Sequence, residues 1–143
     1  MRVLVGWVLA MTMLTAYAAD PPGPPPAPSG LPFSTALAVG DTLYVSGHLA
    51  IDPKTGQAPA DPRAEAAMVL DAVKKTVEAS GFTMDELVSV TVYCTDLGLY
   101  DTFNSVYRGY FHGRFPTRAF IGVSTLLRGA HFEIQGIADR RSR

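Results

Sequence analysis

Four side chains belong to the types that most often bind metals or act as nucleophiles: Cys94, His48, His112 and His131. The three histidines show none of the short spacings that a tetrahedral zinc site needs, so the sequence predicts no bound metal. Cys94 ends an alternating run, Val88 to Cys94, on the same face as the valines of that run. We therefore interpret Cys94 as a small buried hydrophobe and not as a nucleophile.

Three further residues could bind or activate a small acid. The guanidinium of Arg118 is a planar fork that grips a carboxylate through two parallel hydrogen bonds, although a strand arginine can also simply snorkel. Glu133 and Gln135 are two residues apart on a predicted strand and so share one face. Glu133 could exchange a proton with water or form a surface or interface salt bridge, whereas Gln135 can only orient water.

Length and composition indicate one folded domain. The chain has 143 residues, of which 48% are hydrophobic and 17% charged, enough to bury a core. Its net charge is −1, with 12 Lys and Arg against 13 Asp and Glu, and its basic run Arg140–Arg143 lies at a terminus. A protein that neutralises several phosphates carries a basic excess, so we expect no nucleic-acid partner.

The first residues have the pattern of a signal peptide. Arg2 precedes the apolar run Val3 to Ala16, and Ala16-Tyr17-Ala18 supplies the small residues that signal peptidase requires. We predict that residues 1–18 are removed, with cleavage after Ala18 or Ala19, and that the mature protein is periplasmic or secreted. It would then meet a membrane only through the transient signal peptide. An uncleaved anchor is the alternative.

Residues 19–29 are predicted to form a linker. Six of the nine residues from Pro21 to Ser29 are proline, which removes backbone donors and favours a stiff polyproline-like tether. A docking ligand of the PxxP type is the alternative. The folded domain is expected over residues 30–140.

Periodicity in that domain predicts the order ββαβαββ and the α+β class. Asp61 and Pro62 are a helix cap and first helical residue, and Gly81 ends that helix. A second helix carries an aromatic stripe and ends near Gly113. The expected strands are Ser34–Val39, Thr42–Ser46, Val88–Cys94, Arg118–Val123 and Ala130–Ala138.

This order of elements has a consequence for assembly. Right-handed crossovers place both helices on one face of a mixed sheet. The other face keeps apolar residues and has nothing from its own chain to cover it. We therefore expect copies of the chain to associate through that face.

Several strings in one register resemble the RidA/YjgF (L-PSP) family. They cover residues 30 to 140 and are the following: Leu43-Tyr44-Val45-Ser46-Gly47-His48, Asp52-Pro53-Lys54-Thr55-Gly56, Val92 to Leu97, Phe103-Asn104-Ser105-Val106-Tyr107, Phe115-Pro116-Thr117-Arg118-Ala119 and Phe132 to Ala138. The resemblance implies a chorismate-mutase-like fold and a homotrimer with clefts between subunits. It also implies hydrolysis of 2-imino or 2-enamino acids to 2-keto acids and ammonia, without metal or organic cofactor.

The same resemblance implies a set of site residues. Arg118 matches the arginine that holds the substrate carboxylate, and Asn104 stands where the family also has asparagine. We read the position of the family's catalytic glutamate as Gln135. We read the pocket tyrosine as Phe33 and the pocket cysteine as Phe120, so Phe33, Phe120, Asn104 and Arg118 are the expected substrate-binding residues.

Two functions remain open from the sequence. The first is an enzyme that hydrolyses a small imine or enamine acid and anchors it through Arg118. The second is a non-catalytic module that binds a small carboxylate, such as a 2-keto acid, and has lost the proton-transfer group at Gln135. Endoribonuclease activity, reported for relatives, is poorly supported by the net charge of −1.

Overall fold

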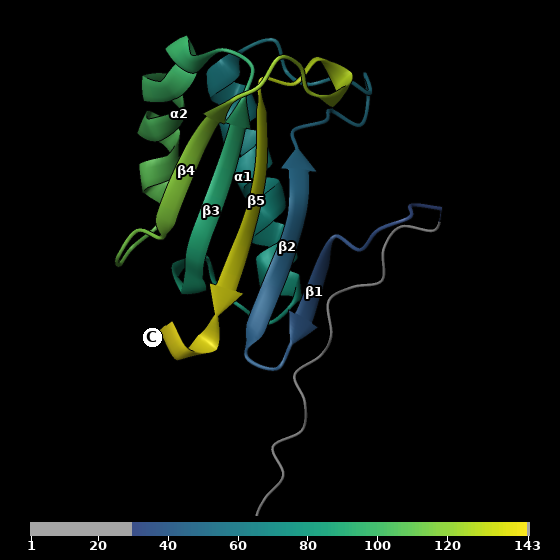
Figure 1. The fold of residues 1–143 in the computed structure, drawn as a ribbon. Helices are drawn as coiled ribbons and strands as arrows, with labels where there is room; N and C mark the ends of the chain where they lie inside the picture. The colour runs from purple at the N-terminus through teal and green to yellow at the C-terminus, as the bar shows by residue number, and fades with distance from the viewer. Residues whose placement is uncertain (1–29, 143) are drawn as a thin grey trace, which may run out of the picture.

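The computed structural model describes residues 30–142, which form one five-stranded sheet and two α-helices (Figure 1). The elements are β1 (Ala36–Val39), β2 (Thr42–Leu49), α1 (Pro62–Ala79), β3 (Leu87–Cys94), α2 (Tyr100–Tyr107), β4 (Thr117–Gly122) and β5 (Phe132–Asp139). The predicted α+β class and ββαβαββ order are therefore confirmed. The signal peptide and linker predicted for residues 1–18 and 19–29 lie outside the described residues.

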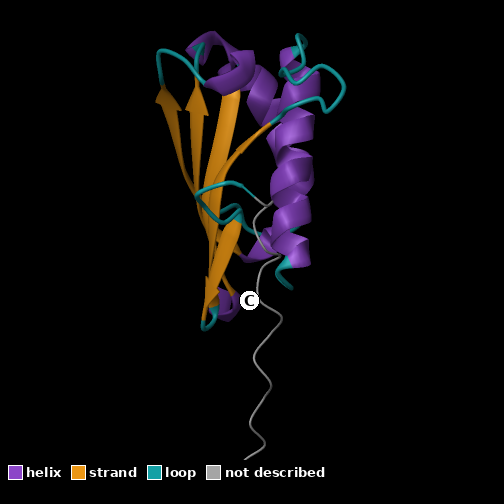
Figure 2. Cartoon of the chain, turned by 90° about the vertical axis from the view of Figure 1, so that its right-hand side faces the viewer, coloured by secondary structure: helices purple, strands orange, loops and turns teal. Residues whose placement is uncertain are grey.

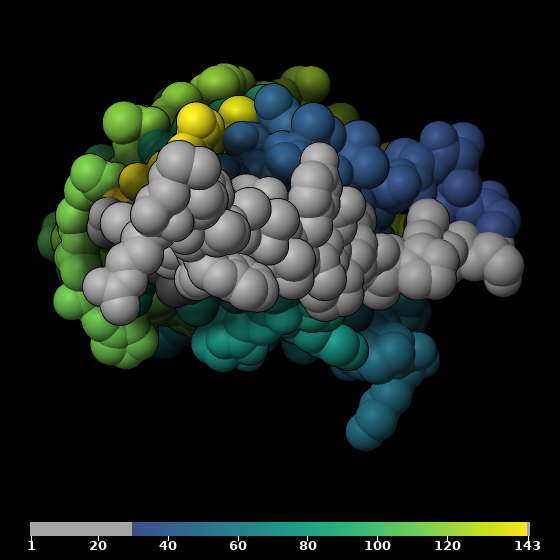
Figure 3. All heavy atoms as spheres, turned by 90° about the horizontal axis from the view of Figure 1, so that it is seen from below, coloured from purple at the N-terminus to yellow at the C-terminus, as the bar shows by residue number. Residues whose placement is uncertain are grey.

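The strands lie in the order β1-β2-β5-β3-β4. All neighbouring pairs are antiparallel except β3 and β4, which are parallel. Helix α1 connects β2 to β3 across β5, and α2 connects β3 to β4. Both helices cover the same face of the sheet, as predicted (Figure 2). The view from below shows the teal atoms of α1 on one side and the blue atoms of β1 and β2 on the other (Figure 3).

Helix α1 begins and ends at the residues that the sequence indicated. The carboxylate of Asp61 accepts hydrogen bonds from the backbone N–H groups of Arg63 and Ala64, and Pro62 is the first helical residue. After the helix, Gly81 takes a positive φ of 75°, a conformation that glycine adopts without strain. The helix buries an apolar stripe against the sheet: Ala66, Val69, Leu70, Val73 and Val77.

Two element ends differ from the predictions by three residues or more, and the other strand ends differ by no more than two. Helix α2 ends at Tyr107, and a short 3₁₀ turn over Arg108–Tyr110 replaces the helix expected as far as Gly113. Strand β2 continues to Leu49 instead of ending at Ser46. A β-bulge between Val45 and His48 interrupts the register there, so the strand resumes after the point where simple alternation is lost.

The face of the sheet away from the helices is called the open face here. Its exposed large apolar side chains are Phe33, Leu37, Val39, Tyr44 and Ile121. Residues facing the helices, such as Leu43, Val92 and Ile134, are buried. The apolar character expected for the uncovered face is confirmed. Over residues 30–142, no helix is long and apolar enough to span a membrane.

Candidate functional site

Arg118 lies near the start of β4, half-buried on the side of the sheet that carries α2. Its Nη2 atom donates a hydrogen bond of 2.7 Å to Oδ1 of Asn104 on α2. The hydroxyl of Tyr100, at 3.5 Å, is a weaker acceptor for the same nitrogen. An arginine side chain has five N–H donors. Among the described residues, Arg118 makes two side-chain hydrogen bonds, both from Nη2. The remaining donors are available to an anion.

Aromatic rings surround the guanidinium of Arg118. Its central carbon lies 4.7 Å from the ring centroid of Tyr107, and 5.6 to 5.9 Å from three others: Tyr100, Phe120 and Phe103. These distances allow cation–π attraction, which holds the charged group in place without neutralising it. The side chain of Arg118 is thus fixed by packing and by Asn104, and its charge has no carboxylate partner among residues 30–142.

A cavity of about 270 Å³ lies beside this arginine. Its lining residues are Asn104, Tyr107, Arg108, Phe115, Pro116 and Arg118. Burial raises the pKa of the Tyr107 phenol to about 12, although the positive charge of Arg118 acts in the opposite direction. The phenol therefore stays neutral at physiological pH and does not cancel the charge of Arg118.

Phe120 lies two residues after Arg118 and faces the same side. It packs edge-on against Tyr100 at 5.0 Å and against Phe103 at 5.5 Å. Of the predicted site residues, the structure therefore brings together Arg118, Asn104 and Phe120. We call these three residues the arginine half of the site.

The other predicted residues lie on the open face. Gln135 points outward from β5, and its Nε2 atom donates a hydrogen bond of 3.0 Å to the hydroxyl oxygen of Tyr93 on β3. Phe33 precedes β1 and is 52% exposed. Both residues line a cavity of about 500 Å³ together with Ser34, Leu37, Tyr44, Val45, Ser46, Ser89, Thr91, Gly136 and Ile137.

Glu133 also projects from β5 onto the open face, next to Gly47 of β2. A Cβ atom added at Gly47 would lie 3.0 Å from Cδ of Glu133 and closer still to its Oε1 atom. The glycine therefore makes the space that the carboxylate occupies. Glu133 forms no ion pair with any described residue, so the salt bridge considered from the sequence is not made within residues 30–142. We call Glu133, Gln135 and Phe33 the glutamate half.

His48 anchors the β-bulge beside Glu133. Its Nδ1 atom lies 2.7 Å from the carbonyl oxygen of Ser46, and its Nε2 atom lies 2.8 Å from the hydroxyl of Thr76 on α1. A carbonyl oxygen can only accept, so Nδ1 carries the proton and Nε2 of the neutral ring accepts from Thr76. Burial lowers the pKa of His48, while the backbone bond to Ser46 and the charge of Glu133 act in the opposite direction.

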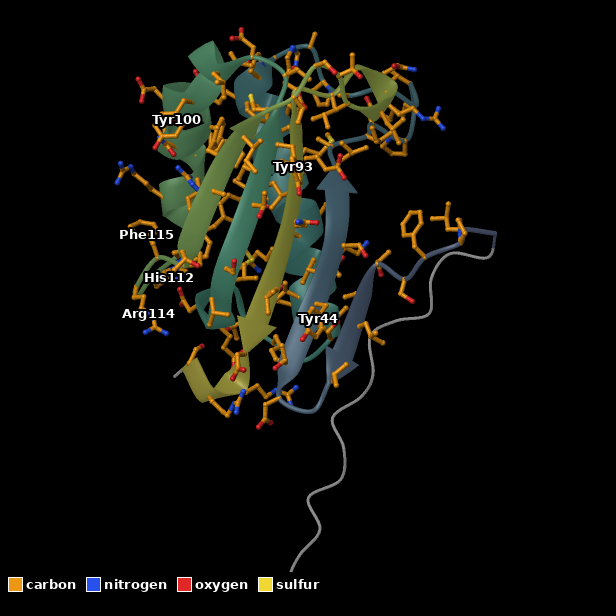
Figure 4. All side chains as sticks on the ribbon, viewed as in Figure 1. Tyr44, Tyr93, Tyr100, His112, Arg114 and Phe115 are labelled. Carbon is orange, nitrogen blue, oxygen red and sulfur yellow. The ribbon has the colours of Figure 1, made fainter. Side chains whose placement is uncertain are left out.

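The two halves face opposite sides of one sheet. Arg118 contacts α2, whereas Glu133 and Gln135 alternate with the buried Ile134 and so point away from the helices. Figure 4 shows Tyr100 and Phe115 at the edge formed by α2 and β4, and Tyr93 over β3 and β5. A ligand bound to Arg118 therefore cannot reach Glu133 of the same chain without passing around the edge of the sheet.

The remaining residues with nucleophilic or metal-binding side chains contribute to the packing and hydrogen bonding of the fold. Cys94 is fully buried, as predicted; its Sγ atom donates to the carbonyl oxygen of Asp96, and burial raises the pKa of the thiol. His131 bonds through Nδ1 to the buried carboxylate of Glu65, which also accepts from the backbone N–H of Phe132. Within the described part of the chain, no three residues of the metal-binding types come together.

The sequence did not indicate the contributions of Gly47, Tyr93, Tyr100 and Tyr107. A glycine inside a strand is a general signal for close approach by another group, and Gly47 could have been found in that way. The three tyrosines could not, because strand alternation and helical spacing do not reveal which rings meet the guanidinium or the amide of Gln135.

Comparisons of the sequence and of the structure with known proteins point to the same family. The model of the family described as Endoribonuclease L-PSP matches residues 25–140. A RutC family protein of Sulfurisphaera tokodaii is 39% identical over 116 residues, which cover 80% of this chain and 92% of that protein. The 2-iminobutanoate/2-iminopropanoate deaminase of Escherichia coli K12 is 37% identical over 113 residues, which cover 77% of this chain and 88% of that protein.

Among solved structures, E. coli TdcF with bound serine superposes with a TM-score of 0.73 at 32% identity. The match covers 80% of this chain and 92% of TdcF. The resemblance noted from the sequence strings is thereby confirmed over nearly the whole described domain. The chain belongs to the RidA/YjgF family, whose family model is that of Endoribonuclease L-PSP.

Proposed function

We propose that this protein binds a 2-imino acid through Arg118 and hydrolyses it to the 2-keto acid and ammonia. The observation that carries the proposal is the state of Arg118: its guanidinium is held by Asn104 and four aromatic rings, lies beside a cavity, and has no carboxylate partner in residues 30–142. A preorganised, unpaired guanidinium is suited to a planar carboxylate, which it binds through charge-assisted hydrogen bonds. The deaminase name of the E. coli relative supports the reaction.

Proton transfer in this reaction is assigned to Glu133. Water attacks C2 of the imine, so a base must take a proton from the water, and the leaving nitrogen must later receive one. Gln135 has no group that can do this, as the sequence indicated. Glu133 projects from the same face of β5 and occupies the space beside Gly47. The proposal therefore assigns the acid–base role to Glu133, two residues before Gln135, the residue that the resemblance matches to the family's glutamate.

A complete site requires a second copy of the chain. The arginine half and the glutamate half face opposite sides of one sheet, so each chain would present its arginine half to the glutamate half of a neighbour. Such a head-to-tail contact forms a ring when the rotation between neighbours closes, and the family resemblance implies that this ring is a trimer. The exposed apolar side chains of the open face, such as Leu37 and Ile121, support burial against neighbouring copies. The proposed location of this homotrimer is outside the cytoplasm.

The proposal is tested with freshly generated 2-iminobutanoate, whose disappearance is followed with and without the protein. The wild type should accelerate hydrolysis above the spontaneous rate. Glu133→Gln should lower kcat by about 100-fold or more while 2-oxobutanoate still binds, because proton transfer is lost and the anchor is kept. Arg118→Ala should weaken binding itself.

The non-catalytic alternative has its own outcome in the same experiment. If the wild type binds 2-oxobutanoate in an Arg118-dependent manner but leaves the imine at its spontaneous rate, the protein is a binding module. A wild type that neither binds the 2-keto acid nor consumes the imine contradicts both readings of the site.

A further inference from the structure

Tyr93 lies beside two residues of the glutamate half, Glu133 and Gln135. In the antiparallel register of β3 and β5, Tyr93 is directly opposite Glu133, and Thr91 is opposite Gln135. Directly opposed residues of an antiparallel pair have their Cβ atoms about 5 Å apart, so the phenol and the carboxylate are immediate neighbours on the open face. Figure 4 shows the Tyr93 ring on that face.

The hydrogen bond from Gln135 sets the orientation of the phenol. The Nε2 atom of Gln135 donates to the hydroxyl oxygen of Tyr93 at 3.0 Å. A phenol both accepts and donates, so its own O–H remains to be donated elsewhere. In the described part of the chain, no acceptor receives that proton. The phenol proton is therefore free for an acceptor that a ligand brings to the open face.

We propose that the Tyr93 hydroxyl, oriented by Gln135, donates a hydrogen bond to the heteroatom on C2 of the bound acid. This inference rests on the proposed function, because it takes the bound molecule to be a 2-imino or 2-keto acid. The keto oxygen and the neutral imine nitrogen accept such a bond. The ammonium of a 2-amino acid has no lone pair and cannot. Tyr93 would therefore make the site select 2-keto and 2-imino acids over the corresponding amino acids.

Gln135 has a defined part in this arrangement, as a positioning residue. Its amide nitrogen donates, which leaves the phenol proton for the ligand. A carboxylate at position 135 could only accept, so it would take the phenol proton for itself. The two views of residue 135 then make opposite predictions. If this position needs an acid–base group, Gln135→Glu raises the rate of imine hydrolysis; if it orients Tyr93, the same substitution lowers the rate.

The test compares the affinities of 2-oxobutanoate and 2-aminobutanoate, measured by calorimetry on the assembled protein. Tyr93→Phe should weaken 2-oxobutanoate binding by about fivefold to tenfold, the usual effect of one neutral hydrogen bond, and should leave 2-aminobutanoate unchanged. Gln135→Glu should reduce the same selectivity. Tyr110→Phe is the matched control: its hydroxyl bonds to Ala67 and Asp71 on α1, away from both halves, so the selectivity should equal that of the wild type.

The outcomes separate this inference from the proposed function. Equal selectivity in Tyr93→Phe and the wild type, while Arg118→Ala loses binding, overturns the role of Tyr93 and leaves the proposed function standing. A higher rate of imine hydrolysis in Gln135→Glu overturns the positioning role of Gln135. A wild type that binds no 2-keto acid overturns both proposals. Light scattering on each variant verifies that the assembly is unchanged.

Discussion

The Oδ1 atom of Asn104 lies 2.7 Å from Nη2 of Arg118 and joins α2 to β4 at the edge of the sheet. This bond, together with the ring of Tyr107, fixes a guanidinium that has no anionic partner in residues 30–142. A side chain as flexible as arginine loses rotamer entropy when it binds a ligand. Holding it beforehand reduces that loss, which gives Asn104 a positioning role.

Replacement of Asn104 by alanine should therefore weaken the binding of 2-oxobutanoate by about threefold to tenfold, because Arg118 is no longer oriented. Asn104→Asp should place a carboxylate against Arg118 and compete with the ligand, so it should weaken binding more. Isothermal calorimetry measures both effects. Ser105→Ala on the same helix removes only a bond to the carbonyl of Thr102 and should bind as the wild type does. Full affinity in Asn104→Ala would mean that the rings alone position the guanidinium.

Gly47→Ala should impair catalysis without unfolding the protein. The added Cβ would lie 3.0 Å from Cδ of Glu133 and nearer to Oε1, so the end of this side chain must move. A displaced base lowers kcat, and we expect a loss of about tenfold or more in imine hydrolysis. Gly109→Ala is the control, since a Cβ there meets nothing within 4 Å. Wild-type turnover in Gly47→Ala would argue against Glu133 as the acid–base group.

Protonation of His48 should couple stability to pH. Burial lowers the pKa of His48 in the folded protein below its unfolded value of 6.5, so the unfolded state binds more protons as the pH falls through that interval. The stabilising contribution is fully present above pH 6.5 and decreases as the pH falls toward the folded pKa. The melting temperature of the wild type should therefore drop between pH 7 and pH 5 more than that of His48→Gln.

The matched control for this pH dependence is Ser105→Ala, because it removes a hydroxyl that does not titrate and that bonds only to the carbonyl of Thr102. This variant should keep the slope of the wild type. Equal slopes for the wild type and His48→Gln, measured by thermal denaturation in one buffer series, would show that folding does not lower the pKa of His48.

Assembly through the open face, taken with the trimer that the family resemblance implies, predicts a mass three times that of the monomer, measured by light scattering at micromolar concentration. Ile121→Asp should reduce association, because a carboxylate would be buried without a partner. Leu127→Asp lies in the turn after β4, where the side chain is 74% exposed, and should leave the mass unchanged. A stable wild-type monomer would contradict both the assembly and the divided site.

The fold could be predicted well where local chemistry determines it. Asp61, Pro62 and Gly81 fix the ends of α1 through capping and backbone conformation, which act within a few residues. The end of β2 was placed too early at Ser46, because the bulge depends on pairing with β5, which lies far away in the sequence. Local patterns do not contain that register.

The site could be predicted only in part for the same reason. Arg118 and Asn104 were both identified, and the structure brings them together at 2.7 Å. Strand alternation could not show that Arg118 and Gln135 face opposite sides, because it assigns two faces to each strand without saying which of them meets the helices. The hydrogen bond between Gln135 and Tyr93 depends on the register of β3 against β5.

The divided site is tested most directly by mixing two inactive variants. Arg118→Ala lacks the anchor and Glu133→Gln lacks the base, so each pure assembly should show little hydrolysis of 2-iminobutanoate. Unfolding and refolding an equal mixture should restore activity, since about a quarter of the sites in randomly mixed rings would combine an intact arginine half with an intact glutamate half from the neighbour. Recovery of roughly that fraction is the result that the account predicts. If the mixture stays as inactive as its components while refolded wild type regains activity, Arg118 and Glu133 do not act across subunits, and the account is contradicted.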